Sequence, residues 1–352
     1  MTMAAEYKQL LQRAPQPIPK APWLKAPAPS KGARVSLPQN IAHRGYKASF
    51  PENTMGAFRG AVDVGAHAIE TDLHLSKDGV VVLSHDATLK RCFGIDTKIS
   101  ECNWDTLSTL RTVRDKNEGM PRLRDLLDMM NRPGMEHLWI LLDVKIDDDA
   151  DDLLSAVERT LREVTPTQHP PWHHRVVLGL WNTAFLKAAR RHLPEYPMVH
   201  ISFYLPYSRH FLAIPNLGFN VFQKVLVGKG GRRFMQEAQE KDRPVLAWTV
   251  NEERWMEWCI AQNETFMSSE TLTVNGRMID GVITDDPLLF SHVCDRCEKT
   301  GPTKLQGWAR TRSHIEMARQ VMVIKLLAMT FFFVRVWQGK FDWFGYLEDH
   351  QE

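Results

Sequence analysis

Two histidines in the first quarter of the sequence have the surroundings of an acid–base pair. His43 closes a short apolar run and is followed directly by Arg44, and His85 lies beside Asp86 after another apolar run. Imidazole gains and loses protons near neutral pH, which suits general acid and base catalysis. One histidine at a strand end is more often a hydrogen-bonded structural residue. Two of them, each near acidic residues, favour the interpretation that His43 and His85 are catalytic.

Carboxylates form a second group. Glu70 and Asp72 are two residues apart in a predicted strand, so both side chains point to the same side. Two such carboxylates repel each other unless a cation lies between them. Oxygen ligands favour hard cations, so we expect Mg²⁺ or Ca²⁺, with Asp143 of a neighbouring predicted strand as third ligand. The alternative, which these residues leave open, is that the carboxylates form a salt bridge to a lysine or arginine of the same fold.

Fixed positive charges accompany these groups. Arg44 offers a planar fork for phosphate oxygens, and Lys145, two residues after Asp143, offers a point charge. An acid, a base, a divalent cation and two fixed cations are together what displacement at a phosphate requires. The combination therefore predicts phosphoryl chemistry, although none of these residues is specific alone.

Short apolar runs alternate with amphipathic segments from Asn40 onward, which is typical of β–α units and a parallel sheet. Eight main strands over this length predict an α/β fold, a closed (β/α)8 TIM barrel, with an open doubly wound sheet as the alternative. The strands are expected at 41–43, 68–75, 80–84, 138–144, 175–180, 198–203, 221–227, 245–250 and 281–284. The helices are expected at 53–64, 123–131, 150–164, 182–192, 231–241 and 252–262.

The rest of the chain divides around this barrel. Lys77-Asp78-Gly79 has the chemistry of a tight turn and predicts a hairpin, so we expect a small insertion after the second strand. Residues 1–38 are predicted to be an extended proline-rich N-terminal arm that either lies over the barrel or stays disordered. Residues 39–295 are predicted to be the catalytic domain, and residues 296–352 a basic and apolar tail.

Composition restricts the function class and the compartment. The 352 residues carry a net charge of +2, which does not suggest a general nucleic-acid binder. The five cysteines are an odd, scattered set, and the single Cys294-x-x-Cys297 pair has no second pair that would suggest zinc. Because the N-terminus has no apolar core of a secretory signal, we expect an intracellular protein with reduced thiols, not a secreted one.

The tail predicts association with a membrane. Val321–Trp337 contains 17 residues, of which only Lys325 and Arg335 are charged, and an aromatic-rich segment follows. Its two internal charges favour a helix lying in the interface over one that spans the bilayer. Five Lys/Arg against one acid in residues 300–325 would attract anionic lipid of the endoplasmic reticulum, lipid droplets or mitochondria. The alternative is a buried helix packed on the barrel.

Several stretches resemble the glycerophosphodiester phosphodiesterase family: AHRGYKASFPENTMGAF, AIETDLHLSKDGVVVLSHDATLKRCFG and LLDVK, with AWTVN and DGVITDDP similar to its closing strands. The resemblance covers about residues 41–289. It implies a TIM barrel with an insertion at 76–86 and a divalent metal held by three acids. The implied roles are catalysis by His43 and His85, metal binding by Glu70, Asp72 and Asp143, phosphate or substrate binding by Arg44, Lys145 and Trp248, and proximity to the metal for Glu52.

Within this family the chain resembles the fungal phosphatidylglycerol phospholipase C branch, where Asp is tolerated at the position of Asp143 although many members have Glu. The family mechanism would be two-step, through a cyclic phosphate. The expected substrate is phosphatidylglycerol, a glycerophospholipid, cleaved to diacylglycerol and glycerol 3-phosphate. The alternatives are a soluble glycerophosphodiester phosphodiesterase or lysophospholipase D, and a lipid-binding barrel without activity.

Overall fold

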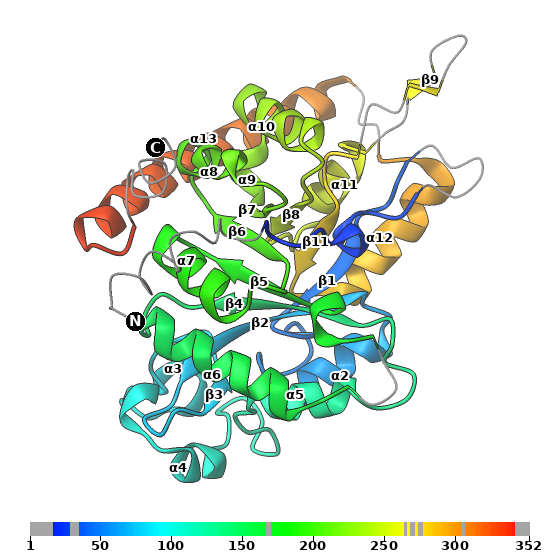
Figure 1. Ribbon diagram of the computed structural model, residues 1–352. Coiled ribbons are helices and arrows are strands. Elements are labelled where there is room, and N and C mark those ends of the chain that lie inside the picture. Colours follow the sequence, from blue (N-terminus) through cyan, green and yellow to red (C-terminus); the bar gives the residue numbers. More distant parts are fainter. Residues whose placement is uncertain are drawn as a thin grey trace, which may run out of the picture.

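Eight parallel strands close into a barrel in the computed structural model, which describes residues 17–28, 35–166, 170–263, 266–267, 272–273, 277–303 and 307–341 (Figure 1). The first strand pairs with both the second and the last, so the sheet has no open edge there. The TIM-barrel prediction is therefore confirmed, and the open sheet is excluded. The barrel strands are β1 (Gln39–His43), β2 (Ala68–Leu75), β4 (Trp139–Val144), β5 (Val176–Leu180), β6 (Met198–Ser202), β7 (Gly218–Phe222), β8 (Val245–Trp248) and β11 (Gly281–Thr284).

Helices surround the barrel and follow its strands along the chain (Figure 1). In one of them, Ala150–Glu163, the buried positions Leu153, Leu154, Val157 and Leu161 recur at helical spacing and face the sheet. Because each strand leads into a connection at its carboxyl end, polar residues at those ends meet at one rim. The covering helices are α2 (Met55–Asp63), α5 (Leu123–Met130), α6 (Ala150–Glu163), α7 (Thr183–His192), α8 (Leu205–His210), α10 (Lys229–Glu240), α11 (Glu253–Ala261) and α12 (Pro287–Thr300).

The insertion after β2 begins with the predicted hairpin. β3 (Val81–Leu83) runs antiparallel to β2, and Gly79 in the connecting turn has a φ of +78°, a conformation that favours glycine. The insertion is longer than the predicted 76–86. It has a small apolar cluster, separate from the main core, that includes Leu107 and Met120. It holds α3 (Lys90–Phe93), η2 (Ile99–Glu101) and α4 (Trp104–Thr109). Two short 3-10 turns and a two-stranded sheet lie elsewhere: η3 (Trp172–His174), η4 (Phe211–Ala213), β9 (Phe266–Met267) and β10 (Leu272–Thr273).

One prediction around the sixth barrel strand was wrong. The strand predicted at 221–227 is β7, which ends at Phe222, followed by the short helix α9 (Gln223–Leu226). The run VFQKVLV is mainly apolar, so periodicity alone cannot separate a buried strand from a buried helix. The helix expected at 231–241 is α10, which begins two residues earlier, at Lys229, with Gly228 at φ +91° as its cap residue.

Part of the proline-rich arm closes the barrel at the amino ends of the strands. The turn η1 (Pro22–Leu24) places Leu24 in the same apolar cluster as the barrel-interior residues Ile41 and Leu141. Trp23 packs edge-on against Trp139, with ring centroids 5.4 Å apart. Of the two alternatives for the arm, residues 17–28 thus lie on the barrel. Residues 1–16 and 29–34 lie outside the described residues.

His200 on β6 is buried on the outer side of the barrel and is expected to make stability pH-dependent. It stacks on Phe211 at 3.8 Å, and burial lowers its pKa to about 3. In the unfolded chain His200 binds a proton near pH 6.5, whereas in the fold it stays neutral down to about pH 3. The free energy of unfolding is therefore highest above pH 6.5 and falls as pH decreases toward 3. His200→Phe should remove a slope of about 1.4 kcal/mol per pH unit from the free energy of unfolding. Denaturant titrations from pH 7 to 4.5 measure this, and parallel curves for both proteins would contradict it.

The C-terminal helix α13 (Gly307–Trp337) runs past α8, α9 and α10 on one side of the barrel (Figure 1). A stripe at helical spacing is buried on the barrel and consists of Val321, Ala328 and Phe332. This face of α13 therefore packs on the barrel, as the alternative prediction of a buried helix expected. Lys304 and residues 342–352 lie outside the described residues, as do the side chains of Arg310 and Arg312.

The opposite face of α13 is apolar and exposed. Leu326, Leu327 and Trp337 are 59%, 62% and 87% exposed. An ordinary surface helix presents polar residues on this side. By length and composition alone, the helical segment Ile315–Trp337 is long and apolar enough to cross a membrane. We call this the outer face; its large exposed hydrophobic residues are Ile315, Met322, Val323, Leu326, Leu327, Met329, Phe331, Phe333, Val334 and Trp337.

Candidate active site

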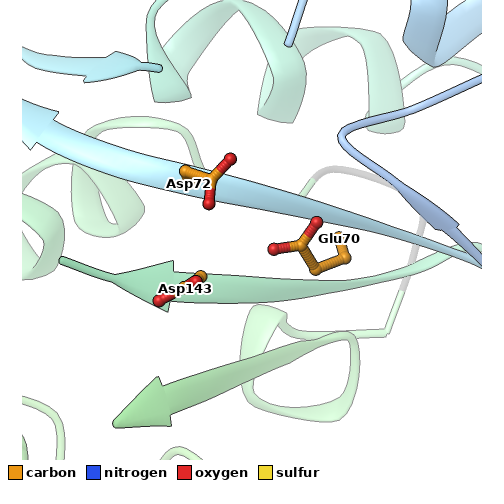
Figure 2. Close-up of side chains that lie close together, drawn as sticks. All are labelled: Glu70, Asp72 and Asp143. Atoms are coloured by element: carbon orange, nitrogen blue, oxygen red, sulfur yellow. The ribbon is translucent and has the colours of Figure 1, made fainter. Parts of the chain in front are cut away.

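Strand register brings the predicted site residues to one rim of the barrel. β1 and β2 pair so that His43 lies beside Glu70, and β2 and β4 pair so that Asp72 lies beside Asp143. Figure 2 shows the three carboxylates side by side on these neighbouring strands. All of them are buried, and ligand oxygens from the three residues lie within 4.8 Å of one another. The three acids named from the sequence thus form one cluster.

The charge balance of this cluster suits a divalent cation. Burial, together with the nearby charges of Asp72 and Asp143, raises the pKa of Glu70 well above its ordinary value. A cation placed between the three carboxylates would relieve that repulsion, and oxygen ligands of this kind are those preferred by Mg²⁺ and Ca²⁺. The residues present therefore fit a hard metal ion, as predicted, without distinguishing the two ions.

Two basic side chains also pair with this cluster. The Nζ of Lys145 lies 2.7 Å from Oδ1 of Asp72 and 2.6 Å from Oδ2 of Asp143, and the Nε of Arg44 lies 3.1 Å from Oδ2 of Asp72. Burial would raise the pKa of Asp72, but Lys145 and Arg44 outweigh it and hold that pKa well below its usual range. The salt-bridge alternative is thus present for Asp72 and Asp143. Among the described residues, Glu70 has no such lysine contact, so it is the acid that most needs a cation.

Each predicted catalytic histidine is held by a carboxylate at Nδ1. His43 Nδ1 is 2.5 Å from Oδ1 of Asp285, and His85 Nδ1 is 2.8 Å from Oδ1 of Asp86. Such a contact fixes the ring orientation and makes Nε2 the nitrogen available for proton transfer. Burial lowers the pKa of both histidines, so both tend toward the neutral form. This arrangement is suited to general acid–base chemistry.

Arg44 is held in a strained conformation that fixes its guanidinium. Its φ of +58° is rare for a residue other than glycine, and its backbone N–H donates to the backbone oxygen of Glu70 at 2.8 Å. Its Nη1 donates to Oε1 of Glu52 at 2.8 Å. Gly45 follows at φ +76°, where a Cβ would lie only 2.7 Å from the backbone of Ala57. Glycine is therefore needed here for contact with α2.

Glu52 supports the basic residues of the site. Besides Arg44, it accepts two hydrogen bonds from Arg91 of α3, at 2.8 and 2.7 Å. Burial would raise the pKa of Glu52, but these arginines lower it to about 2. Arg91 also donates to Asp86 at 2.6 Å, so one side chain of the insertion links the supports of Arg44 and His85. Sequence reasoning placed Glu52 near the metal and missed Arg91.

Three further residues were missed as site residues. Asn53 has a φ of +52° and donates to Oδ2 of Asp72 at 2.8 Å, while Thr54 caps α2. Trp181 donates from Nε1 to Oδ1 of Asp143 at 2.7 Å. Asp285, the partner of His43, follows β11 directly. Its place at a barrel strand end was the signal that could have identified it.

Trp248 lies at the end of β8 on the same rim. Its ring is half-buried, lies edge-on to Trp181 with centroids 5.7 Å apart, and donates from Nε1 to the backbone oxygen of Asn220 at 3.1 Å. A cavity of about 500 Å³ is lined by residues that include Lys47, Glu52 and Asp285. Partners of His43 and Arg44 thus line this cavity, while Trp181 borders the acidic cluster.

The Glycerophosphoryl diester phosphodiesterase family model matches residues 43–289, which contain every predicted site residue. The chain belongs to this family. The prediction of a phosphoric diester hydrolase is therefore confirmed at the level of the family.

Individual proteins are similar to this chain over different shares of its length. A glycerophosphoryl diester phosphodiesterase structure from Silicibacter pomeroyi, described as putative, has a TM-score of 0.63 at 20% identity, covering 78% of this chain and 96% of that one. A phosphodiesterase from Oleispira antarctica, solved with its product sn-glycerol-3-phosphate, has a TM-score of 0.61 at 22% identity, covering 74% and 97%. A lysophospholipase D of Rattus norvegicus is 44% identical over 68 residues, which are 19% of this chain and 22% of that protein. This last alignment spans about a fifth of the relative's length.

Proposed function

We propose that this protein is a metal-dependent phosphodiesterase that cleaves phosphatidylglycerol at a membrane surface into diacylglycerol and glycerol 3-phosphate. The observation that carries the proposal is the pair of histidines, each oriented by a carboxylate at Nδ1, beside three buried acids. Family membership supports the reaction class. The intact set of acidic, basic and imidazole groups argues against a lipid-binding barrel without activity.

In the first step a hydroxyl of the head glycerol attacks the phosphorus. Nε2 of one histidine takes the hydroxyl proton while the new O–P bond forms. The P–O bond to diacylglycerol breaks, and Nε2–H of the other histidine protonates the departing oxygen. Arg44 and Lys145 are the cations proposed to bind the phosphoryl oxygens. The product of this step is a cyclic glycerophosphate.

In the second step water attacks the cyclic phosphate and the two histidines exchange roles. The first histidine, now protonated, gives its proton to the ring oxygen as that P–O bond breaks, and the second takes a proton from water. The product is glycerol 3-phosphate. A divalent cation bound by Glu70, Asp72 and Asp143 would supply stabilisation of negative charge on the phosphate oxygens. Asp285 and Asp86 keep the histidine Nε2 atoms facing the phosphorus throughout.

Phosphatidylglycerol is the preferred substrate because its head glycerol carries a free hydroxyl beside the phosphodiester, as the cyclic step requires. The same group is found in soluble glycerophosphodiesters. In a lysophospholipid, the free hydroxyl is on the acyl-bearing glycerol, so the head alcohol would leave. Lysophospholipase D activity is therefore the second candidate, favoured by the local identity to a lysophospholipase D.

Product analysis tests the proposal. Purified protein is incubated with phosphatidylglycerol vesicles, with Mg²⁺ or Ca²⁺ and without either, and in parallel with glycerophosphocholine and lysophosphatidylcholine. We expect diacylglycerol and glycerol 3-phosphate from the vesicles. Choline release from the other two substrates, with phosphatidylglycerol intact, would replace the proposal with the soluble or lysolipid activity.

We also propose that the outer face of α13 binds an anionic membrane surface. Next to it, α10 carries the exposed basic residues Lys229, Arg232 and Arg233 in its first turns, where the helix dipole favours acidic residues instead. Lys325 of α13 donates to the backbone oxygen of Val227 at 2.6 Å, which keeps the two helices adjacent. An apolar face edged by cations is suited to a helix that lies in the interface.

Leu326→Glu combined with Leu327→Glu should abolish most of this membrane binding. Both side chains are more than half exposed, so the fold does not depend on them. Two carboxylates on the outer face would have to enter the apolar boundary of the bilayer, and we expect at least a tenfold loss of co-sedimentation with phosphatidylglycerol vesicles.

Leu288→Glu on α12 provides the matched control, since Leu288 is an exposed leucine away from the outer face. It should bind vesicles as the wild type does. Equal binding of all three proteins would show that the outer face does not contact lipid. Concentration-dependent dimerisation without vesicle binding would assign this face to a second copy of the chain.

We propose a catalytic unit at 39–295, with the arm at 1–38 and the tail at 296–352 as accessory segments, in an intracellular membrane-associated protein. The five unpaired cysteines support a reducing compartment. Because Leu24 belongs to the apolar cluster inside the barrel, removal of the arm should destabilise the catalytic unit.

A further inference from the structure

The segment after α13 is attached to the catalytic rim and not merely to the side of the barrel. Lys340 donates from Nζ to the backbone oxygen of Ile146, just after β4, at 2.9 Å. Asn182, just after β5, donates from Nδ2 to the backbone oxygen of Lys340 at 2.8 Å. Tyr204, just after β6, stacks on Phe332 with ring centroids 4.5 Å apart. These contacts bring the C-terminal segment to the carboxyl ends of the strands, where the reacting groups lie.

A continuous row of aromatic rings connects the acidic cluster with α13. It begins at Trp181, whose Nε1 donates to Asp143 and whose ring lies 5.7 Å from that of Trp248. The ring of Phe203 follows, 6.1 Å from Trp181. Phe331 of α13 is next, 5.3 Å from Phe203. We call Trp248, Trp181, Phe203 and Phe331 the aromatic row.

The four rings of the aromatic row are not fully buried by the contacts they make. Trp248, Trp181 and Phe203 are only half-buried, and Phe331 is 50% exposed at the edge of the outer face. Phe332, the neighbour of Phe331, is 1% exposed and already packs α13 against the barrel through Tyr204. Attachment of the helix therefore does not require Phe331. Exposed apolar surface that leads from a polar site to an apolar face is typical of a ligand-binding surface.

We propose that the aromatic row binds the hydrocarbon chains of the substrate while its phosphate lies at the acidic cluster. It would lead a lipid from the membrane at the outer face to the histidines without passing through water. This inference rests on the proposed function, since it presumes a substrate that has such chains. It adds that the C-terminal helix forms part of the substrate site as well as the membrane contact.

Calorimetric titration of alkyl phosphates tests the row independently of any turnover. The probes are ethyl phosphate and decyl phosphate, both in the same Mg²⁺ buffer and below the concentration at which decyl phosphate forms micelles. We expect the wild type to bind decyl phosphate at least tenfold more tightly than ethyl phosphate, because only the longer chain reaches the rings. Phe331→Ser should reduce this preference to about threefold or less.

Phe333→Ser is the matched control. Phe333 has the same side chain on the same helix and is 48% exposed, but it packs near Tyr204 and is not part of the aromatic row. It should keep the tenfold preference. Equal binding of the two probes by the wild type, or the same loss in both variants, would overturn the aromatic row. Failure of the proposed function would be seen separately, as intact phosphatidylglycerol in the vesicle assay while chain-length preference persists.

Discussion

His43→Ala is expected to lower the kcat/KM for phosphodiester cleavage by about 10²–10⁴-fold, the usual contribution of a positioned acid or base. The variant removes Nε2, the nitrogen left available by the contact of Nδ1 with Asp285. Folding should survive, because Asp285 keeps Lys47 at 3.3 Å and Asn251 at 3.0 Å as partners. The loss should concern the chemical step more than substrate binding, since Arg44 and Lys145 remain.

The control for this prediction is His200→Phe. His200 is also a buried histidine, but it lies on the outer side of the barrel against Phe211 and contacts none of the reacting groups. Its replacement should leave turnover near the wild-type value at neutral pH. Steady-state rates with a dispersed glycerophosphodiester, together with a circular dichroism spectrum, compare the two variants. A folded His43→Ala protein with wild-type turnover would remove His43 from the mechanism.

The sequence predicts the barrel well because its strands are read from local composition. The expected strands 68–75 and 281–284 coincide with β2 and β11, and the turn after β2 is identified by its Lys-Asp-Gly sequence. β7 was misplaced because the apolar run through Val227 continues from a strand into α9. In such a run, burial hides the difference between a period of two and one of 3.6 residues.

Side-chain partnerships in the site were less accessible from the sequence. Acidic residues two apart on one strand predict a shared side, so the acidic cluster could be anticipated. Asparagine just before a helix is typical of a cap residue, and only the left-handed backbone of Asn53 turns its amide to Asp72. Arg91 reaches Glu52 across 39 residues, and no spacing rule predicts such a contact.

The tail shows the same limit. Apolar residues surround much of α13, so its sequence is compatible both with packing on the barrel and with contact with lipid. The structure divides these roles between faces: Phe332 is buried against Tyr204, while Leu327 is exposed on the outer face. Which residue belongs to which face depends on where the rim of the barrel lies, and this is a property of the whole fold.

Glu70→Gln is expected to weaken divalent-metal binding by about 100-fold or more. Loss of a residue that only supports a metal ligand already costs about 10–100-fold in affinity, and Glu70 is proposed to bind the metal directly. Glu70 is the acid of the cluster whose pKa is raised well above its ordinary value, by burial first and then by Asp72 and Asp143. In metal-free wild type, Glu70 keeps its proton in the fold at pH values where it ionises in the unfolded chain, so the free energy of unfolding falls as pH rises above about 4.3, its pKa in the unfolded chain. The variant should lack this destabilisation and be at least as stable as wild type without metal.

Thermal unfolding with and without Mg²⁺ or Ca²⁺ measures both effects. Metal at 100 times its dissociation constant should stabilise the wild type by about 2.7 kcal/mol, and Glu70→Gln by much less at the same concentration. Glu118→Gln is the matched control, because Glu118 accepts from the backbone of Gly56 at 3.1 Å and lies outside the acidic cluster. It should respond to metal as the wild type does. If metal stabilises neither the wild type nor the control, Lys145 with its contacts to Asp72 and Asp143 is the permanent cation of this site, and the barrel works without a metal ion.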